Sequence, residues 1–299
     1  MNITVTGASG FLGTRLLERL TTLGHSVHGL ARKPPKGQAK RVAFSAWDVT
    51  DGTRPAEAFE KAEAVVHLAG EPIAQRWTPE VKRRIRESRS EGTRNLVSRI
   101  EVTGKQVRTL VSASAIGYYG SRGDDLLTEA SPPGTGFLAD ICAEWERAAE
   151  QARAAGIRVV TIRNGIVLGR EGGALRQMLT PFRLGVGGKL GDGQQWMSWI
   201  HADDLVELIR FAVEEPRLSG PVNGTTPNPV RNIDFTRALA KALHRPAFLP
   251  VPVLALKLLY GEMAEVLTSS QRVLPHAAVA AGFRFQYPFI DDAFEAIFG

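Results

Sequence analysis

Apolar and polar residues alternate in two different ways along the front half of the chain. Short runs rich in β-branched residues predict strands at residues 3–6, 26–31, 42–46, 64–68, 109–113 and 158–163. Longer stretches between them carry apolar residues at helical spacing, as in the stripe formed by Leu12, Leu16, Leu20 and Leu23. The alternation of strand and helix predicts an α/β fold in which crossover helices connect the strands of a parallel sheet.

The pattern changes after residue 170. Residues 170–205 are rich in glycine and include two tryptophans, and no regular element is predicted for them. Long ordered loops of this kind usually cover a site. Helical periodicity returns from Pro250 onward. We therefore expect a larger domain over residues 1–170, which residues 200–225 complete, and a smaller lobe over residues 171–299.

Composition and charge narrow the class of protein. The 299 residues are 43% apolar, which is enough for one large core, and the net charge is +6. Basic residues are scattered except in the run 82–86, where a solvated helix face explains them, so no nucleic-acid partner is expected. The single cysteine, Cys142, excludes an internal disulfide. With no signal peptide or bilayer span recognised, we expect a cytoplasmic protein without a membrane partner.

The stretch "VTGASGFLG", residues 5–13, lies where the first predicted strand passes into a helix. Gly7 permits a tight turn, Gly10 lets a pyrophosphate approach the backbone, and Gly13 lets helix and strand pack closely. The helix start, with Ser9, Phe11 and Leu12, supplies amide donors to the anion. The flanking strands favour a dinucleotide site over the alternative, a tight turn without a ligand.

The end of the second predicted strand bears on the choice of cofactor. NAD-specific sites usually have an acidic residue there that binds the ribose 2′-hydroxyl. This chain has Arg32 and Lys33 instead, and a guanidinium can pair with a 2′-phosphate through two parallel hydrogen bonds. The cofactor predicted is NADP. The alternative is that Arg32 is a surface cation that happens to follow a strand.

Further motifs along the chain carry a family resemblance. They are "VVHLAG" (65–70), "RSEGTRNLV" (89–97), "SASAIGYYG" (112–120), "ICAEWE" (141–146), "RNGIVLG" (163–169), "PFRLGVGG" (181–188) and "SWIHADDL" (198–205). Together with the glycine-rich loop, they resemble the extended and atypical short-chain dehydrogenase/reductases, the sugar-nucleotide epimerase superfamily. The pattern is similar to that of uncharacterised epimerase-family proteins that end in a small domain of unknown function. That domain is expected here at about residues 250–297.

The resemblance implies a Rossmann-type doubly wound parallel sheet that binds NADP, with a smaller C-terminal lobe on the side of a small-molecule substrate. It also implies that Asp48 lies near the adenine and that Leu68, Ala69 and Gly70 line the ribose side. Arg89 takes the position of an asparagine that approaches the cofactor in relatives. A guanidinium there suits a phosphate or a carboxylate; the alternative is an exposed helix cation.

The same resemblance draws attention to a missing pair of residues. Relatives use a tyrosine as general acid/base and a lysine four residues later that lowers its pKa. Counting back from Glu146, the family's helix glutamate, places Leu138 in the tyrosine position and Cys142 in the lysine position. Leucine has no proton to give, and an unpaired helix thiol is more often a small buried hydrophobe than a nucleophile.

Other residues are candidates for the chemistry. Ser114 keeps the family's serine position, although it also suits a strand-end turn. Tyr118 and Tyr119 follow, and either hydroxyl is a candidate proton donor unless both rings are core residues. Five more residues are candidates for an apolar pocket with an anion contact, with core packing as the alternative: Trp77, Arg183, Trp196, Trp199 and His201. No metal site is expected, and Asp203 or Asp204 is expected to cap a helix.

Three functions follow from these residues. The first is an NADP-binding oxidoreductase of the epimerase family that acts on an unidentified small molecule. The alternatives are a non-catalytic NADP-binding sensor or scaffold, and a sugar-nucleotide epimerase or dehydratase. The resemblance also implies a homodimer through the helix of residues 135–150, whose apolar stripe is Ile141, Trp145, Ala148 and Ala149. Burial of that stripe within one chain is the alternative.

Overall fold

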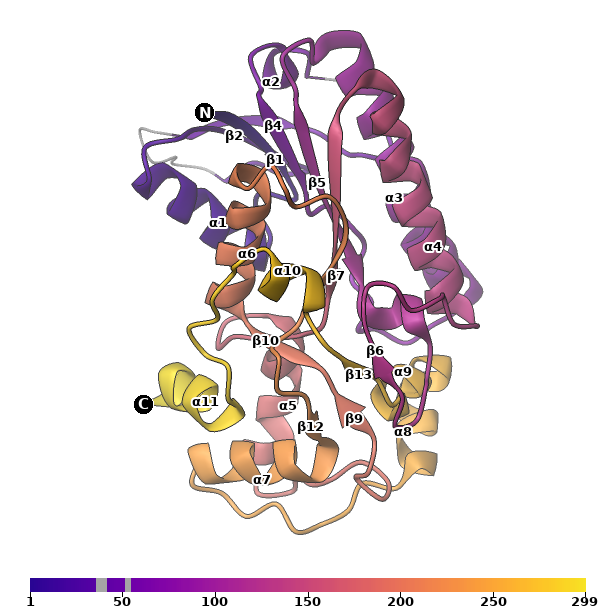
Figure 1. Cartoon of the computed structure of the whole chain (residues 1–299). Coiled ribbons are helices and arrows are strands. Elements are labelled where there is room, and N and C mark those ends of the chain that lie inside the picture. Colours follow the sequence, from indigo (N-terminus) through magenta and orange to yellow (C-terminus); the bar gives the residue numbers. More distant parts are fainter. Residues whose placement is uncertain (36–41, 52–54) are drawn as a thin grey trace.

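A seven-stranded parallel sheet forms the centre of the molecule in the computed structural model, which describes residues 1–35, 42–51 and 55–299 (Figure 1). The strand order is β11-β7-β5-β4-β1-β2-β3. Every neighbouring pair in this order is parallel. The strands are β1 (Asn2–Thr6), β2 (Ser26–Ala31), β3 (Val42–Ala46), β4 (Ala64–His67), β5 (Thr109–Ala115), β7 (Arg158–Asn164) and β11 (Gly220–Gly224). The predicted α/β fold of Rossmann type is confirmed.

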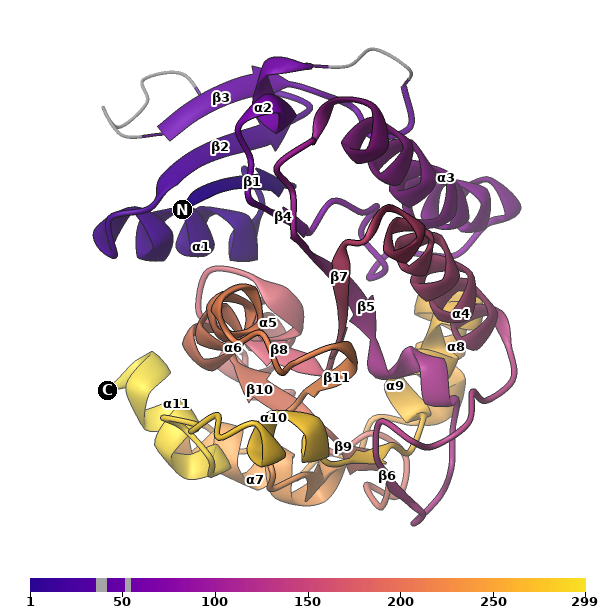
Figure 2. The same ribbon diagram turned by 45° about the horizontal axis from the view of Figure 1, so that its top comes forward.

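Helices cover both faces of this sheet. The helices α1 (Phe11–Thr22) and α6 (Ala202–Glu214) pack on one face, where their apolar sides meet β1, β4 and β5 in one core. The long helices α3 (Pro79–Thr103) and α4 (Phe137–Glu150) lie side by side on the other face, with the short α2 (Glu57–Glu60) and η2 (Gln151–Ala155) (Figure 2). Helices on both faces explain why β4, with the sequence AVVH, is buried at every position.

All six predicted strands lie in this sheet, with differences of one or two residues at their ends. The strand β11 was not predicted because its sequence, GPVNG, lacks a β-branched run. The helix predicted from Phe11 is α1, and Gly24, with a φ of 84°, follows its end.

The prediction that residues 170–205 lack regular structure is wrong. They include the helix α5 (Gly173–Arg183), which buries Leu175, Leu179 and Phe182 at helical spacing. They also include the strands β9 (Trp196–Met197) and β10 (Trp199–His201). Glycines before and at the start of α5, and Pro181 within it, hide the helical pattern in the sequence.

A second group of elements packs below the sheet in Figure 1. Its small sheets pair β8 (Ile166–Leu168) with β10, β12 (Val230–Arg231) with β9, and β13 (Arg272–Val273) with β6 (Leu126–Leu127). Around them lie α5, α7 (Asn232–Ala242) and α11 (Ile290–Phe298), which share a core around Trp199, Phe235 and Phe294. The remaining elements are α8 (Val253–Tyr260), η3 (Gly261–Met263), α9 (Ala264–Thr268) and α10 (His276–Ala280).

This second group closes over the carboxyl end of the sheet. The segment η1 (Ile116–Tyr119), which directly follows β5, lies between the sheet and the small sheets (Figure 1). Met263 of η3 packs with Val81 of α3 and Ile141 of α4. Ligands of doubly wound proteins bind at the carboxyl ends of the strands, so this junction is where the site is sought. Within residues 1–35, 42–51 and 55–299, no helix is long and apolar enough to cross a membrane.

Candidate functional site

The loop between β1 and α1 has a geometry that only glycine allows. Gly7 has a φ of 66°, and a Cβ there would lie 2.8 Å from the backbone of Leu68 and Ala69. A Cβ on Gly13 would lie 2.3 Å from the carbonyl oxygen of Gly7. The amide of Gly10 donates to that same oxygen at 2.9 Å. The three glycines therefore let the turn, the helix and the neighbouring loop approach one another closely.

The start of α1 is open to an anion. Gly10 is its N-cap residue, and no side chain caps the helix. A pocket of about 480 Å³ lies against this end. Its lining residues are Ser9, Gly10, Phe11, Thr14, Arg15, Glu18, Glu171, Gly172 and Arg176. Uncapped amides at the positive end of a helix, with Arg15 and Arg176 nearby, make the pocket suitable for a phosphate group.

Two exposed cations stand at the same edge of the sheet. Arg32 and Lys33 directly follow β2, and both are exposed. Because β2 is the parallel neighbour of β1, with Leu30 opposite Thr6, the ends of the two strands lie side by side. The amide of Ala8, in the glycine-rich loop, donates to the carbonyl of Leu30 at 3.2 Å. This contact places the glycine-rich loop beside the end of β2, which Arg32 and Lys33 follow.

Residues 68–70 form the opposite wall of the loop. The amides of Leu68 and Ala69 each donate to Thr6, to its carbonyl and hydroxyl oxygens respectively, both at 3.3 Å. This is the point where β1 and β4 are neighbours and the chain order of the sheet reverses, which is the usual ligand position in such folds. Asp48 follows β3, where its carboxylate accepts hydrogen bonds from the amide and hydroxyl of Thr50.

Arg89 is buried, so the alternative that it is an exposed helix cation is wrong. Its side chain crosses from α3 to the end of β4, and one nitrogen donates to the carbonyl of Glu71 at 3.0 Å. A Cβ on Gly70 would lie 3.4 Å from the guanidinium carbon. The same carbon lies 5.0 Å from the ring centroid of Trp145 on α4. Burial lowers the pKa of Arg89 to about 10, so the group remains a cation at neutral pH.

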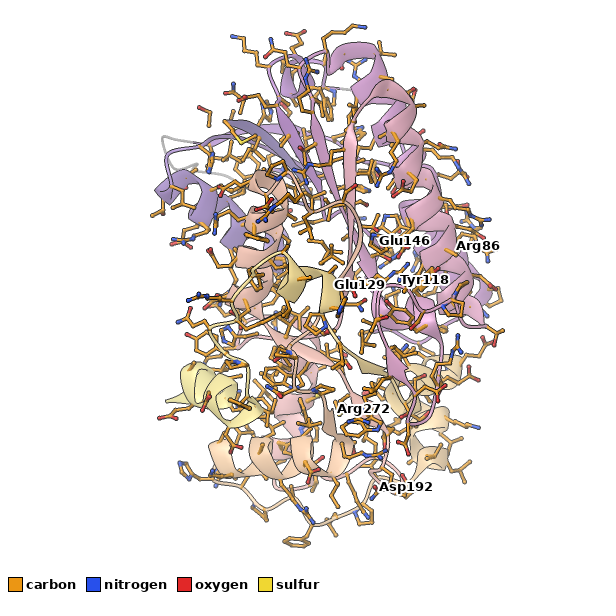
Figure 3. The ribbon with its side chains drawn as sticks, in the orientation of Figure 1. Arg86, Tyr118, Glu129, Glu146, Asp192 and Arg272 are labelled. Carbon is orange, nitrogen blue, oxygen red and sulfur yellow. The ribbon has the colours of Figure 1, made fainter. Side chains whose placement is uncertain are left out.

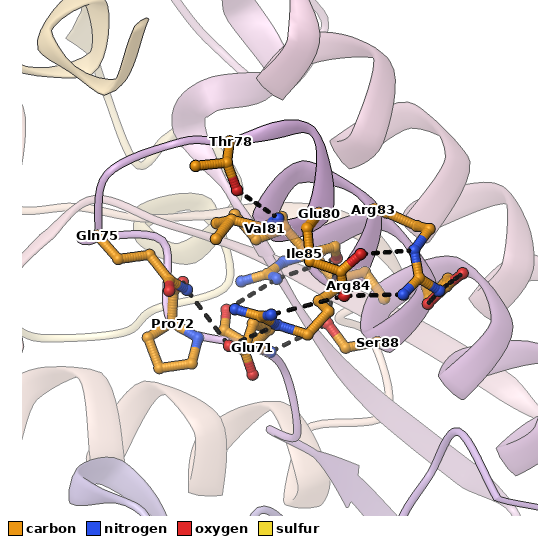
Figure 4. Close-up of polar contacts among 12 residues, drawn as sticks. Glu71, Pro72, Gln75, Thr78, Glu80, Val81, Arg83, Arg84, Ile85 and Ser88 are labelled. Carbon is orange, nitrogen blue, oxygen red and sulfur yellow. Dashed lines mark hydrogen bonds and ion pairs between the residues drawn. The ribbon is translucent and has the colours of Figure 1, made fainter. Parts of the chain in front are cut away.

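Polar contacts hold the segment after Gly70 against α3 (Figure 4). The amide of Glu71 donates to the hydroxyl of Ser88 at 3.0 Å. The Glu71 carboxylate accepts from the side chain of Gln75 at 3.3 Å and lies 3.5 Å from the guanidinium of Arg84. These contacts fix the backbone at the edge where Arg89 and residues 68–70 meet.

His67 is a residue of this edge that the sequence did not single out. It ends β4, is fully buried, and lies 2.7 Å from the hydroxyl of Thr6 and 3.0 Å from that of Thr93. Burial, and secondarily the charge of Arg89, lowers the pKa of His67 to about 4. A neutral imidazole therefore ties β1, β4 and α3 together. The only sequence signal was a histidine at the end of an apolar strand.

A buried hydrogen-bond network lies at the neighbouring ends of β5 and β7, around Glu146, which Figure 3 labels. Ser114 donates to the carboxylate of Glu146 at 2.6 Å. Arg163 contacts that carboxylate through two nitrogens, each at 2.8 Å. Arg163 also donates to the Tyr119 hydroxyl at 2.9 Å, and Tyr119 donates to Asn223 at 2.7 Å. The roles of Arg163 and Asn223 could not be read from their positions in sequence.

This network engages two of the three predicted catalytic residues. Ser114 and Tyr119 are buried, and burial raises the pKa of Tyr119 to about 12. Although burial alone would lower the pKa of Arg163, its hydrogen bond and attraction to Glu146 raise it above the usual range. Tyr118 differs from both, because its ring is partly exposed and its hydroxyl has no hydrogen-bond partner among the described residues. The guanidinium carbon of Arg163 lies 3.5 Å from its ring centroid.

The positions assigned to the missing tyrosine and lysine are apolar. Leu138 and Phe137 pack in a cluster with Tyr260, Val266 and Leu267 from the α8–α9 region. A Cβ on Gly117 of η1 would lie 3.2 Å from Leu138 Cβ and 3.8 Å from Cys142 Sγ. Burial raises the pKa of Cys142 to about 12. Neither side chain can exchange a proton at neutral pH, as the sequence indicated.

The five residues proposed as one pocket do not come together. Trp199 is fully buried in the core shared by α5, α7 and α11, whereas Trp77 belongs to the cluster around Met263. Arg183 is exposed at the end of α5. His201 caps α6 by accepting from the amide of Asp203, so the expected aspartate cap is wrong. Both oxygens of Asp204 instead accept backbone amides of residues 286 and 287.

The long helices α3 and α4 carry the basic run and the apolar stripe that the sequence singled out. The basic residues of the run 82–86 are ion-paired along α3: Lys82 with Glu262, Arg83 with Glu80 and Glu87, Arg84 with Glu71 and Glu80, and Arg86 with Glu144. The apolar stripe of α4 that was considered for a dimer is buried within the chain. It packs against α3 and the sheet, so it offers no surface to a second copy; a homodimer stays a prediction.

Comparison with known proteins adds to this geometry. Residues 3–223 match the NAD dependent epimerase/dehydratase family, and residues 251–297 match a domain of unknown function, DUF1731. The chain is 44% identical to the epimerase family protein SDR39U1 homolog, chloroplastic, of Arabidopsis thaliana, over 99% of this chain and 86% of the relative. It is 39% identical to the epimerase family protein YfhF of Bacillus subtilis, over 98% and 96%.

A solved structure matches this chain along its whole length. The crystal structure of human epimerase family protein SDR39U1 (isoform 2) with NADPH has a TM-score of 0.89 and 33% sequence identity. The match covers 99% of both chains. The resemblance inferred from the motifs, to epimerase-family proteins that end in a domain of unknown function, is confirmed. With its glycine-rich loop at the edge between β1 and β4, the chain belongs to the NAD dependent epimerase/dehydratase family.

Proposed function

We propose that the protein is an NADP-dependent oxidoreductase that acts on an unidentified small molecule. The observation that carries this proposal is the combination of the glycine cradle with two exposed cations, Arg32 and Lys33, at the same edge of the sheet. No carboxylate directly follows β2, where an NAD-specific site would have one. The human relative crystallised with NADPH supports the same cofactor.

The residues at this edge fit NADP part by part. The uncapped amides of Phe11 and Leu12 would hold the pyrophosphate, with Ser9 and Gly10 in the same pocket. Arg32 and Lys33 would hold the 2′-phosphate, and Asp48 would lie toward the adenine. Residues 68–70 would line the ribose side. When bound, NADP supplies or accepts the hydride, so the protein has to bind, orient and handle one proton.

Arg89 has a defined part in this proposal. One of its nitrogens is held by two carbonyl oxygens, those of Glu71 and Ile85, which aims the guanidinium along Gly70. It stacks beside Trp145, three residues after Cys142 on α4. We infer that Arg89 supplies, from α3, the positive charge toward the ribose and phosphate that the missing lysine would supply from α4.

Among the three proposed catalytic residues, Tyr118 is best supported as the proton donor. The hydroxyls of Ser114 and Tyr119 are used within the network of Glu146, Arg163 and Asn223. A donor must first have a hydroxyl that a substrate can reach, and only Tyr118 of these three has one without a protein partner among the described residues. Ser114 and Tyr119 would then position η1 rather than exchange the proton.

Titration calorimetry tests the cofactor. We expect NADPH to bind at least about tenfold more tightly than NADH, equivalent to about 1.4 kcal/mol. Arg32→Asp should remove most of this preference, because it reverses the charge that faces the 2′-phosphate. Arg237→Asp, at an exposed site on α7, is the matched control and should keep it. Equal affinities of the unaltered protein for the two cofactors would contradict the proposal.

Steady-state turnover tests the chemistry. With a panel of carbonyl compounds and NADPH, Tyr118→Phe should lower the rate by roughly 10²-fold while NADPH affinity stays unchanged. Tyr287→Phe removes a hydroxyl of the same type outside η1 and should have little effect. If Ser114→Ala or Tyr119→Phe alone abolishes turnover in a folded protein, the proton donor lies in the network instead.

A second candidate function is a sensor or scaffold that binds NADP without turnover. The apolar cluster around Leu138 and the use of Ser114 and Tyr119 in the network favour it. Tight NADPH binding without reduction of any compound in the panel would support this candidate over the oxidoreductase. Under either function we expect no epimerisation of UDP-sugars, because no group in the tyrosine or lysine position can move a proton.

A further inference from the structure

Eight exposed apolar side chains belong to two segments of the C-terminal lobe, and we call them the α8 surface. They are Leu184, Val186, Phe248, Leu249, Val253, Leu254, Leu258 and Leu259. Fourteen large apolar side chains are exposed among the described residues, so more than half of them fall within these two short segments. Single exposed apolar residues are ordinary, whereas a group of this size marks a surface that contacts a partner.

The two segments lie side by side. A Cβ on Gly185 would lie 3.8 Å from the ring of Pro246, and one on Gly191 would lie 3.2 Å from a methyl carbon of Val253 at the start of α8. The loop that follows α5 therefore runs beside the connection between α7 and α8. Figure 1 shows this connection and α8 at the end of the molecule opposite the seven-stranded sheet.

The helix α8 buries little of its apolar surface. Seven of its eight residues, VLALKLLY, are apolar, yet only Leu256 is buried. Phe248, in the connection before the helix, is 78% exposed, and Leu254 and Leu258 are each 69% exposed. A helix that is apolar on all sides is normally buried in protein or in lipid. Side chains this exposed protrude from the molecule, which suits a soft surface that closes around them.

The charges in the two segments have one sign. Residues 183–191 and 243–261 contain four lysines or arginines and no aspartate or glutamate. Arg183, Arg245 and Lys257 are exposed, and none of the three forms an ion pair with a residue in the described ranges. Apolar side chains beside unpaired cations are complementary to a surface that is both apolar and anionic.

The neighbouring charges do not reverse this sign. The nearest acidic residues along the chain are Asp192 and Glu262, and Glu262 forms an ion pair with Lys82 at 2.6 Å. The exposed Arg76 donates to the carbonyl oxygen of Leu258 at 3.1 Å, which brings a further cation to α8. A second copy of the chain would place the same cations against these and be repelled, so the α8 surface does not suit a copy.

We propose that the α8 surface attaches the protein to the surface of a membrane that contains anionic lipids. Phe248, Leu254 and Leu258 would enter the boundary between headgroups and acyl chains. Arg245 and Lys257 would remain at the level of the lipid phosphates, because their long apolar stems let the charged ends reach the headgroups. Figures 1 and 2 show α1 and α8 on opposite sides of the molecule, so this contact would leave the start of α1 open.

This proposal replaces the expectation that the protein has no membrane partner. That expectation rested on the absence of a recognised bilayer span and signal peptide, and a peripheral contact requires neither. The sequence signal was weak, because the apolar run of residues 251–260 is also typical of a helix buried within a lobe. The exposure of α8 in the folded chain distinguishes the two.

Sedimentation with large vesicles tests the proposal on the full chain. The probes are vesicles of phosphatidylcholine alone and vesicles of phosphatidylcholine and phosphatidylglycerol in a ratio of about 2:1. We expect the anionic vesicles to bind at least about tenfold more tightly than the neutral ones, with an affinity that falls as salt concentration rises. Equal binding to both vesicles would overturn the proposal. Absence of binding to the anionic vesicles would also overturn it, in favour of an acidic protein as the partner.

A pair of charge variants separates the α8 surface from the net charge of +6. Lys257→Glu and Lys105→Glu change the net charge equally, but Lys105 lies exposed in the connection between α3 and β5. We expect Lys257→Glu to weaken binding to anionic vesicles by about fivefold or more, and Lys105→Glu by less than about twofold. Equal weakening in the two variants would show that the net charge alone attracts the protein, which contradicts the proposal.

A fluorescent label tests whether the apolar side chains enter the bilayer. Because Cys142 is the single cysteine and is buried, a cysteine introduced at the surface can be labelled selectively with a nitrobenzoxadiazole group. Labelled Phe248→Cys should shift its emission to shorter wavelength with anionic vesicles. Labelled Phe289→Cys, at a 57% exposed position outside the α8 surface, should not. No shift at position 248, or the same shift at both positions, would refute insertion of this surface.

An apolar variant distinguishes a membrane from a second copy. Leu258→Gln should weaken binding to anionic vesicles by about tenfold, whereas Leu126→Gln, also at an exposed position, should not. Light scattering without vesicles should give the same mass for the unaltered protein and Leu258→Gln. A larger mass that this variant alone reduces would assign the α8 surface to a second copy and overturn the proposal.

Discussion

Two edges of the same sheet are built differently: the edge at β1, β2 and β4, where we propose that NADP binds (the cofactor edge), and the edge at β5 and β7, where we propose that the reaction takes place (the reaction edge). At the cofactor edge, no side chain of the described residues caps the start of α1, and Arg32 and Lys33 are exposed. At the reaction edge, the polar side chains of Ser114, Glu146 and Arg163 satisfy one another. The first edge is open to a ligand, and the second is closed on itself.

The difference shows where a ligand can gain binding energy. An anion at the start of α1 meets helix amides that no side chain of the described residues caps, so it does not have to displace a capping side chain. A substrate that reached Ser114 would have to compete with the carboxylate of Glu146, and leaving a buried charge unpaired is costly. The network therefore stabilises this edge, and under the proposed function the chemistry depends on groups outside the network, of which Tyr118 is one.

The largest expected effect tests whether the hydrogen-bond network around Glu146 and Arg163 stabilises the fold. In Glu146→Gln, the guanidinium of Arg163, whose side chain is only 4% exposed, loses its carboxylate partner. We expect the free energy of unfolding to fall by about 3–5 kcal/mol in urea denaturation. Glu144→Gln, two residues earlier in α4 with a 26% exposed side chain, is the matched control and should cost less than about 1 kcal/mol. Equal losses in the two variants would show that the network does not stabilise the fold.

The second prediction concerns acid pH at the cofactor edge. The pKa of His67 falls from 6.5 to about 4 on folding, so the unfolded chain takes up a proton first as pH falls. The stability from neutral His67 is present above pH 6.5 and is lost as pH falls toward 4, a change of about 3 kcal/mol. Urea denaturation at several pH values should show a shallower dependence in His67→Gln. The variant His276→Gln, at an exposed position, should keep the dependence of the unaltered protein.

The third prediction concerns a substitution that adds a methyl group within the glycine-rich loop. Gly13→Ala places a methyl group 2.3 Å from the Gly7 carbonyl oxygen, so the loop must shift. We expect unfolding to become easier by about 1–3 kcal/mol and NADPH to bind on the order of 100-fold more weakly, by calorimetry. Gly156→Ala adds a methyl group at a left-handed position with open space around it, so it should strain the fold slightly and leave NADPH binding intact. Unchanged NADPH affinity in Gly13→Ala would contradict the assigned cradle.

The smallest expected effect is at Cys142. Because burial raises the pKa of its thiol to about 12, iodoacetamide should label the native protein very slowly at mildly alkaline pH. Cys142→Ala should cost about 1 kcal/mol in stability and leave NADPH affinity unchanged. Loss of turnover in this variant, with turnover retained in Tyr118→Phe, would mean that the chemistry lies in α4 after all.

The sequence predicted the cofactor edge better than the reaction edge. The glycines of residues 7–13 and the cations after β2 are contiguous in the chain, and their requirements are those of one backbone turn, so the sequence predicted their placement. The six predicted strands were found for a similar reason, because short runs rich in β-branched residues are typical of strands. The helix α5 was missed because its glycines and proline disguise a periodic apolar face.

What the sequence by itself determined is the family, the α/β fold and the cradle, since each depends on short-range patterns that read the same in any context. Only the tertiary structure decided that Arg89 is buried and that the hydroxyls of Ser114 and Tyr119 are engaged in a hydrogen-bond network. Those outcomes depend on side chains from separate elements, such as Glu146 in α4 and Arg163 in β7. A polar side chain can bind a ligand only where its donors and acceptors are not already used by other residues of the protein. Tertiary packing, rather than position in the chain, decides which residues those are.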